Sequence, residues 1–320
     1  MVATDEVVDP ADRRALGRTG IRVSALCAGT AGWSSVAGFR PRAPSMDETR
    51  AAARRLLSGP IRFADTSNNY GGGESEKRWG RIIREHGGLP DDFVLQTKLD
   101  RDALSDDFSG ARVRRSLEES MMRLGVDTLP IVYLHDPEHT TWDEAVSPGG
   151  PVEEMRAMRA EGLVGALGVA GGPIDLLMRY VDLGIFDAVI THNRYTLVDR
   201  SAEPLLRHAH AAGVSVLNGA PYGGGILAAH PRTTDVYRYE RAAPELLEAV
   251  DDMGRALSRR GIPLGAAALQ FSLREPLITS TIFGAPFADH IDAALDLARF
   301  PIPADAWTEM DDIARTHGLL

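Results

Sequence analysis

Short apolar runs, rich in β-branched residues, alternate along the chain with longer stretches in which apolar residues recur at helical spacing. The short runs predict eight strands, at residues 23–29, 61–65, 93–98, 131–134, 164–169, 188–191, 214–217 and 278–283. The longer stretches predict helices at residues 47–57, 74–85, 111–124, 153–160, 175–182, 202–211, 244–259 and 291–298. Strands that alternate with helices are typical of parallel βαβ units. Eight such units in 320 residues predict a closed (β/α)8 barrel, an α/β TIM barrel.

We expect one barrel domain over residues 1–320, with residues 1–13 flexible. Before the first strand, Gly17 and Gly20 lie between apolar residues, which is typical of a β-hairpin that would plug one end of the barrel. Residues 28–33, AGTAGW, lack the G-x-G-x-x-G spacing of an open dinucleotide-binding sheet. Residues 218–243 are too long for a simple connection, so we expect them to cover a functional site.

Composition narrows the possible partners. Hydrophobic residues make up 44% and charged residues 25% of the chain, as in globular proteins. A net charge of −10 argues against a nucleic-acid partner, and no window approaches 18 uncharged apolar residues, so we expect no membrane span. Residues 1–14 lack the apolar core of a signal peptide, and we expect a cytoplasmic protein. Cys27, the only cysteine, lies in an apolar run and is interpreted as a small buried hydrophobe.

Four ionisable residues fall at or just beyond the strand ends where a barrel carries its active site: Asp65, Tyr70, Lys98 and His135. A tyrosine has a pKa of about 10, which a neighbouring ammonium would lower. A carboxylate would hold that ammonium in its charged form, and a histidine would orient the substrate oxygen. Together they would form a tuned proton donor beside a carbonyl oxygen, as hydride transfer requires.

Other interpretations of these residues stay open. Singly, Asp65 fits the cap of a turn, Tyr70 a packed loop aromatic, Lys98 a solvated strand end and His135 a structural histidine. Lys98 could form a Schiff base, although the nearby carboxylate argues against it. A metal-dependent hydrolase would need ligands from His135, Asp136, Glu138 and His139, of which only His135 lies at a predicted strand end. We therefore predict no metal site.

The segment FADTSNNYG at residues 63–71, with Glu74 and Gly80 beyond it, resembles the signature of the aldo-keto reductase family. The strands that carry Lys98 and His135 fall where that family places them. The resemblance runs from about Arg14 to the C-terminus. It implies that Tyr70 is the general acid/base, that Lys98 and Asp65 tune it, and that His135 orients the substrate.

Within the family, the chain resembles the branch of aldose dehydrogenases that act on D-threo-aldoses such as L-fucose, and on L-galactose. Residues 107–118, 193–199 and 237–244 carry this likeness. Pyridoxal 4-dehydrogenases look similar over the same segments, so this alternative stays open. The resemblance implies an NAD(P)-dependent aldose 1-dehydrogenase that oxidises the anomeric hydroxyl of an aldose to a lactone. A general aldehyde reductase and a non-enzymatic nicotinamide-binding regulatory subunit are the remaining alternatives.

The resemblance also implies a set of cofactor contacts: Gly29, Thr30, Asn193, Gly219, Ala220, Pro221, Tyr222, Gly224, Gly284, Ala285 and His290. Trp33 and His135 are the expected substrate contacts. The family usually stacks a tyrosine on the nicotinamide where this chain has Gly219, so we expect Tyr222 or Trp33 to complete the sandwich. Asn193 stands in the slot of the glutamine that usually grips the carboxamide, and residues 170–171, AG, replace a Ser/Asn pair.

The last predicted strand and helix favour NAD over NADP. In the family this segment holds the adenosine half of the cofactor, with the diphosphate at the helix N-terminus. A 2′-phosphate would need an arginine or lysine, and residues 282–298 contain none. They contain Asp289, Asp292 and Asp296, which would repel a phosphate. The expected partner is a small sugar or aldehyde, and the oligomeric state is left open.

Overall fold

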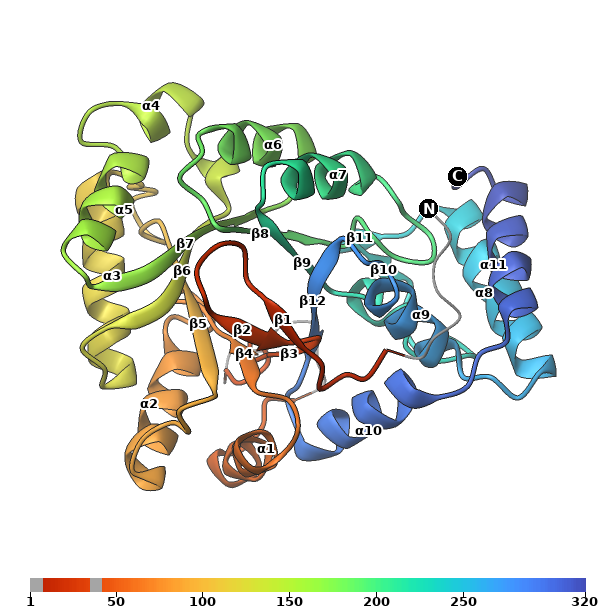
Figure 1. Cartoon of the computed structure of the whole chain (residues 1–320). Coiled ribbons are helices and arrows are strands. Elements are labelled where there is room, and N and C mark those ends of the chain that lie inside the picture. The colour runs from red at the N-terminus through yellow and green to blue at the C-terminus, as the bar shows by residue number, and fades with distance from the viewer. Residues whose placement is uncertain (1–7, 35–41) are drawn as a thin grey trace.

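The computed structural model describes residues 8–34 and 42–320, in which eight parallel strands close into a barrel (Figure 1). Around the barrel the strand order is β12-β3-β4-β5-β6-β7-β8-β9. The bounds are β3 Leu26–Gly29, β4 Phe63–Asp65, β5 Val94–Leu99, β6 Leu129–His135, β7 Val164–Gly171, β8 Ala188–His192, β9 Ser215–Gly219 and β12 Ile278–Gly284. The predicted (β/α)8 barrel is confirmed.

Helices surround the barrel, and each predicted helix is present (Figure 1). Their bounds are α1 Met46–Ser58, α2 Glu74–His86, α3 Gly110–Leu124, α5 Pro151–Ala160, α6 Ile174–Asp182, α7 Glu203–Ala211, α8 Pro244–Arg259 and α10 Ala288–Arg299. Three further helices were not predicted, namely α4 Trp142–Val146, α9 Leu264–Leu273 and α11 Ala304–Thr316. Every residue of α9 is buried, so its sequence has no polar face from which a helical period could be recognised.

The first predicted strand, 23–29, is wrong as one element, because the chain turns at Ala25 between two strands. The strand β2 (Arg22–Ser24) pairs antiparallel with β1 (Arg13–Ala15), which forms the predicted hairpin, and β3 then enters the barrel. Leu16 and Val23 of this hairpin are fully buried in the barrel interior. The Gly17 N–H donates to Ser215 Oγ (2.7 Å) at the start of β9. The hairpin therefore closes the end of the barrel at which the strands begin.

Part of the segment predicted to be flexible lies outside the described residues. In the described part, the carbonyl of Pro10 accepts from Leu26 N (3.1 Å) and that of Asp12 from Ala25 N (2.9 Å). Residues 10–12 are therefore tied to the start of the first barrel strand.

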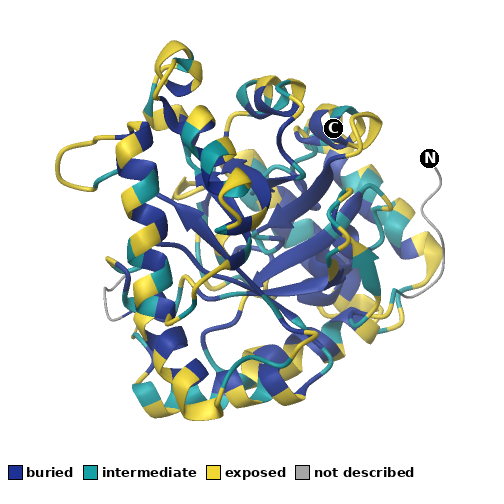
Figure 2. Ribbon diagram, turned by 60° about the vertical axis from the view of Figure 1, so that its left-hand side comes forward, coloured by how far each residue is buried: buried dark blue, intermediate teal, exposed yellow. Residues whose placement is uncertain are grey.

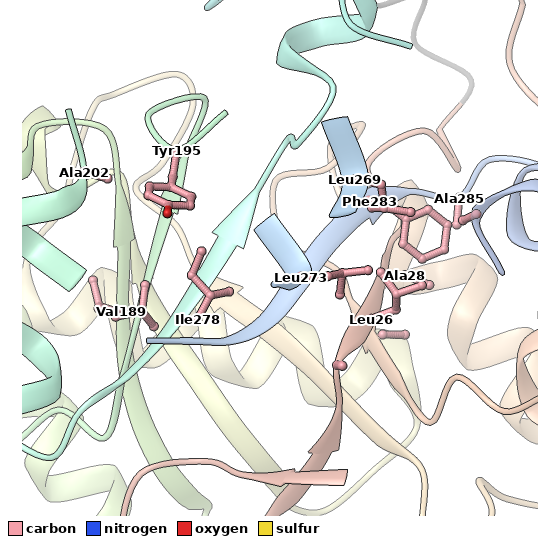
Figure 3. Packing of buried hydrophobic residues seen from close by; sticks show 14 of the residues in the cluster. Leu26, Ala28, Val189, Tyr195, Ala202, Leu269, Leu273, Ile278, Phe283 and Ala285 are labelled. Atoms are coloured by element: carbon pink, nitrogen blue, oxygen red, sulfur yellow. The ribbon is translucent and has the colours of Figure 1, made fainter. Parts of the chain in front are cut away.

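Two hydrophobic clusters hold the fold together. One fills the barrel interior and includes Cys27 and Phe63, and the other lies between the sheet and the helices. In Figure 2 the barrel strands are mostly buried, while the surrounding helices alternate between buried and exposed positions. Figure 3 shows the outer cluster where Leu269 and Leu273 of α9 approach the strands beside Phe283. Cys27 is fully buried, as predicted.

The long connection after β9 contains structure of its own. It includes the 3-10 helix η2 (Gly223–Gly225) and a hairpin of β10 (Val236–Tyr237) and β11 (Glu240–Arg241). Among the described residues, no helix combines the length and apolar character that crossing a bilayer requires.

Candidate active site

Three of the four predicted chemical residues lie on adjacent strands at the end of the barrel opposite the hairpin. Asp65 ends β4, Lys98 is the penultimate residue of β5, and His135 ends β6. Tyr70 lies in the loop between β4 and α2. Because the carboxyl ends of parallel strands meet at one rim, which forms the mouth of the barrel, separate parts of the sequence are brought together there.

Lys98 joins Asp65 and Tyr70. Its ammonium donates to Asp65 Oδ2 (2.7 Å), to Tyr70 Oη (2.8 Å) and to the carbonyl of Thr66 (2.9 Å). Both members of the ion pair are almost fully buried, with 3% and 4% of their side chains exposed. All three protons of the ammonium are therefore used. Burial alone would lower the pKa of Lys98, but the charge of Asp65 and the contact with Tyr70 raise it overall. A protonated, fully bonded ammonium argues against the Schiff-base alternative.

Burial of Tyr70 outweighs the lowering of its pKa that was expected from Lys98. Burial of the phenol is the largest influence and raises its pKa above the ordinary value, while the charge of Lys98 opposes this rise. Tyr70 is therefore a neutral phenol at neutral pH. A neutral phenol beside an ammonium is ready to donate a proton, and any further positive charge at the mouth would favour its phenolate.

The loop that carries Tyr70 is held in a conformation that requires glycine. Gly71 has a φ of 62°, and a Cβ there would lie 2.1 Å from Ser34 Cβ. On the other side, Arg123 Nη1 of α3 donates to the carbonyl of Asn68 (2.9 Å). Contacts on both sides of this loop thus position Tyr70.

His135 has a partner that sequence reasoning missed. Its Nδ1 lies 2.6 Å from Oδ1 of Asp100, which follows β5 directly and is buried. Ser67 Oγ and the Asn69 N–H both donate to the other oxygen of Asp100, at 2.6 and 3.0 Å. The signal was present in the sequence, because Asp100 stands two residues after Lys98 and so points toward the same mouth.

Left-handed residues follow three strands at the rim. Asp136 after β6, Asn193 after β8 and Ala220 after β9 have φ values of 47°, 57° and 56°. His192, at the end of β8, lies edge-on to Tyr239 with ring centroids 5.9 Å apart. Tyr239 is at the tip of the β10–β11 hairpin, so the long connection does reach the mouth. Neither His192 nor Tyr239 was among the predicted site residues.

The residues expected to hold a nicotinamide cofactor fit such a group. Asn193 is 2% exposed, and its Oδ1 has no hydrogen-bond partner within the described parts of the chain. A buried carbonyl oxygen of this kind suits the N–H of a carboxamide. Gly219 is buried, and a Cβ there would lie 3.3 Å from His192 Cβ. Gly29 is similarly tight, since a Cβ would lie 3.1 Å from Ile282. The described part of the mouth thus offers an unsatisfied acceptor at Asn193, while Gly29 and Gly219 are positions where a side chain would crowd the neighbouring strands.

The remaining predicted contacts differ in exposure. Gly284, Gly224 and His290 are exposed, whereas Ala220 and Tyr222 are half-buried and Pro221 and Ala285 are buried.

Two predicted contacts belong to the wall and not to the mouth. Trp33 is fully buried, stacks on Trp79 with ring centroids 4.8 Å apart, and donates its indole N–H to the carbonyl of Ala285 (2.9 Å). Its prediction as a substrate contact or nicotinamide platform is therefore wrong. Thr30 is fully buried too, with its hydroxyl bonded to the carbonyl of Asp65 (2.8 Å) and to Ser75 (3.1 Å). Its side chain is taken by the protein.

Basic side chains reach α10 from elsewhere in the chain. Arg55 of α1 pairs with Asp292, and the guanidinium of Arg42 lies 4.8 Å from the ring centroid of Phe287. Arg42 is itself paired with Glu48. Residues 282–298 thus contain no lysine or arginine, but two arginines from elsewhere in the chain lie next to them.

The metal alternative finds no ligand set in the described residues, where no three His, Cys, Asp or Glu side chains gather closely enough to hold an ion. Glu138, one of the proposed ligands, accepts from the Gly172 N–H (3.1 Å).

Known proteins show what the chain is similar to. The model of the "Aldo/keto reductase family" matches residues 25–315. D-threo-aldose 1-dehydrogenase of Pseudomonas sp is 30% identical, covering 84% of this chain and 88% of the relative. L-galactose dehydrogenase of Arabidopsis thaliana is 30% identical over 94% and 93% of the two chains, and pyridoxal 4-dehydrogenase of Microbacterium luteolum is 26% identical over 97% and 98%. The fold is shared with the holo form of an aldo-keto reductase from Bacillus halodurans, with a TM-score of 0.77, 21% identity, and 94% and 96% of the chains covered.

Proposed function

We propose that this chain, which belongs to the aldo/keto reductase family and is an NAD(P)-dependent oxidoreductase, oxidises the anomeric hydroxyl of an aldose to a lactone with NAD. The observation that carries the proposal is the buried hydrogen-bonded chain from Asp65 through Lys98 to Tyr70 at the mouth of the barrel. We propose Tyr70 as the general acid/base, Lys98 and Asp65 as the groups that tune it, and His135 as the group that orients the substrate oxygen.

The chemistry divides into a hydride and a proton. A nicotinamide held at the mouth would supply the acceptor for the hydride of the anomeric carbon. Tyr70 takes the proton of the anomeric hydroxyl on Oη, because Lys98 at 2.8 Å stabilises the phenolate that must be present beforehand. Asp65 keeps Lys98 charged and fixed in place. Asn193 would hold the carboxamide, and the backbone at Gly29, Gly219 and Gly284 would lie against the rest of the cofactor.

A polyhydroxylated substrate suits the rim. Asp136, 39% exposed along its side chain, offers carboxylate oxygens 3.8 Å from His135 Nε2, where a sugar hydroxyl could donate to it. His192 and the Tyr239 hydroxyl add further polar groups. The names of the two relatives at 30% identity, both sugar dehydrogenases, support the same class.

The acidic residues of α10 support NAD as the cofactor. Asp289 and Asp292 would repel a 2′-phosphate. The two arginines that approach this region, Arg42 and Arg55, are each paired with a carboxylate. Neither guanidinium is free to bind a phosphate without first leaving its partner.

Pyridoxal oxidation is the second candidate, supported by the likeness to pyridoxal 4-dehydrogenase. It would use the same mechanism. The contiguous chain of Asp65, Lys98 and Tyr70 argues against the non-enzymatic regulatory alternative. The acidic composition and the single cysteine support a cytoplasmic setting, which stays a prediction.

The experiment that tests the proposal follows the absorbance of reduced nicotinamide with NAD or NADP, offering L-fucose, L-galactose, D-arabinose and pyridoxal in turn. We expect turnover with NAD and a sugar, and a loss in Tyr70→Phe of about 10²- to 10⁴-fold, as for removal of a general acid/base. Tyr180→Phe is the matched control, because the Tyr180 hydroxyl is buried without a partner in the described structure and lies on α6.

Other results of this assay would change the proposed substrate, cofactor or catalytic residue. Turnover of pyridoxal alone would move the substrate to the second candidate. Preference for NADP would overturn the argument from α10. Equal activity in Tyr70→Phe and Tyr180→Phe would remove Tyr70 from the mechanism. Cofactor binding is followed separately by quenching of tryptophan fluorescence, so that a binding defect is not mistaken for a catalytic one.

A further inference from the structure

The pair formed by Asp100 and His135 determines which ring nitrogen of the histidine carries a proton. An ionised carboxylate only accepts hydrogen bonds. Oδ2 of Asp100 already accepts from Ser67 Oγ (2.6 Å) and from the Asn69 N–H (3.0 Å), which leaves Oδ1 facing His135 Nδ1 at 2.6 Å. The proton of this short contact therefore belongs to Nδ1. In its neutral form the ring then has a lone pair on Nε2.

The other ring nitrogen of His135, Nε2, is the one left for a substrate oxygen. Nε2 lies 3.8 Å from Asp136 Oδ1, which is beyond hydrogen-bond distance, and the His135 side chain keeps 14% of its surface exposed. The ring also lies edge-on to Tyr70, with centroids 6.0 Å apart. A neutral Nε2 can accept a hydrogen bond from a hydroxyl, but it has no proton to donate to a carbonyl oxygen or to the negative oxygen of a transition state.

We propose that Asp100 is a positioning residue that keeps the proton of neutral His135 on Nδ1, so that His135 donates a hydrogen bond to the reacting oxygen only as an imidazolium. The reacting oxygen is that of the proposed function, on which this part of the inference rests. The tautomer itself depends only on the geometry of the pair.

The groups around the ring agree with a charged histidine. Burial alone would lower the pKa of His135, but the charge and hydrogen bond of Asp100, assisted by Asp136, raise it overall. Lys98 acts in the opposite direction. His192, the other imidazole at the mouth, does not compete for the proton, because burial lowers its pKa to about 4. Tyr70 is held neutral, as described above.

The direct test is nuclear magnetic resonance on protein with ¹⁵N-labelled imidazole rings, with His135→Asn to assign the signals. We expect Nδ1 to carry the proton when the ring is neutral, and a pKa above that of free histidine. Asp100→Asn should lower that pKa by at least one pH unit, because an opposite charge within hydrogen-bond reach moves a pKa by about 1 to 3 units. Ser67→Ala, which keeps the charge of Asp100 but also removes the hydroxyl 3.3 Å from His135 Nδ1, should move it far less.

A neutral tautomer protonated at Nε2 in the wild-type protein would overturn the proposal without any variant. So would an unchanged pKa in Asp100→Asn whose circular dichroism and unfolding temperature match those of the parent. Because these spectra need no turnover, they decide on the tautomer even if none of the offered substrates reacts, in which case only the proposed function fails.

Kinetics test the link to the reaction. With the substrate found by the assay above, the pH profile of kcat/KM should contain a fall at the measured pKa of His135, where the imidazolium loses its Nε2 proton, superimposed on the rise that ionisation of Tyr70 gives. In Asp100→Asn this fall should move to lower pH or flatten, because an asparagine allows either tautomer. If the rate profile stays in place while the measured pKa moves, His135 does not act on the reacting oxygen as an imidazolium.

Discussion

Asp65 and Lys98 form a buried ion pair at the mouth of the barrel, and each charge depends on the other for compensation. Both side chains are nearly excluded from water, and Gln96 Nε2 also donates to Asp65 (2.8 Å). Removing one charge of a buried pair leaves the other without compensation.

We therefore expect Lys98→Met to lower the free energy of unfolding by about 3–5 kcal/mol, as for other broken buried pairs. Asp65→Asn should also destabilise. The double variant should lose less than the sum of the two single losses, because neither charge is left alone. Urea unfolding of the four proteins measures this, and strictly additive losses would show that the two charges do not depend on each other.

Residue-scale prediction succeeded where position along a strand decides direction. Asp65, Lys98 and His135 could be predicted to meet, because their places at the carboxyl ends of adjacent strands determine where their side chains point. Trp33 could not, because its indole N–H pairs with the carbonyl of Ala285, far away in the sequence. A sequence read locally gives no sign of such a partner.

At the scale of elements, α2 and α3 pack closely enough to position the Tyr70 loop between them and the barrel. A Cβ on Gly80 of α2 would lie 1.8 Å from the carbonyl oxygen of Arg123 in α3. Arg123 in turn bonds Glu76 of α2 (3.1 Å) and the carbonyl of Asn68 (2.9 Å), two residues before Tyr70.

Gly80→Ala should therefore force the helices apart and destabilise the protein by about 1–3 kcal/mol, the usual range for overpacking. Activity should fall as well, because Arg123 moves with α3. The control is Lys77→Ala, an exposed position in the same helix, which should stay within about 0.5 kcal/mol. Thermal unfolding and kcat measure both effects, and equal behaviour of the two variants would contradict the close packing.

Elements were predictable to the extent that they have two different faces. The amphipathic helices were found within a few residues of their observed ends, whereas α9, apolar on every side, was not. The split between β2 and β3 was missed for a similar reason, since residues 23–28 are buried throughout and the pattern does not mark the turn at Ala25.

At the scale of the whole molecule, the barrel separates what stabilises it from what reacts. The hairpin with Leu16 closes the end where strands begin, while Asp65, Lys98 and His135 lie at the other end. The alternation of strands and helices predicted this arrangement. It could not predict that Arg42 and Arg55 approach α10, because contacts between α1 with the residues before it and α10 arise only when the barrel closes.

We expect Leu16→Ala to lower the free energy of unfolding by about 2–5 kcal/mol, as for other leucines removed from a core. At a temperature where the variant remains folded, KM and kcat should match those of the parent. Leu104→Ala, at a side chain that is 98% exposed, is the control and should change neither stability nor kinetics. A changed KM in Leu16→Ala would show that the two ends of the barrel are coupled.

The three left-handed residues at the rim, Asp136, Asn193 and Ala220, carry a consequence for how this protein can be altered. Non-glycine residues in that conformation store backbone strain, which is least tolerated by the alanine. Substitutions at these three positions that remove the strain, such as glycine for Ala220, would raise the unfolding temperature. Those same turns aim His135, His192 and the amide of Asn193. Selection for thermal stability alone would therefore favour substitutions beside the residues on which turnover depends. Such substitutions would raise stability and lower the rate.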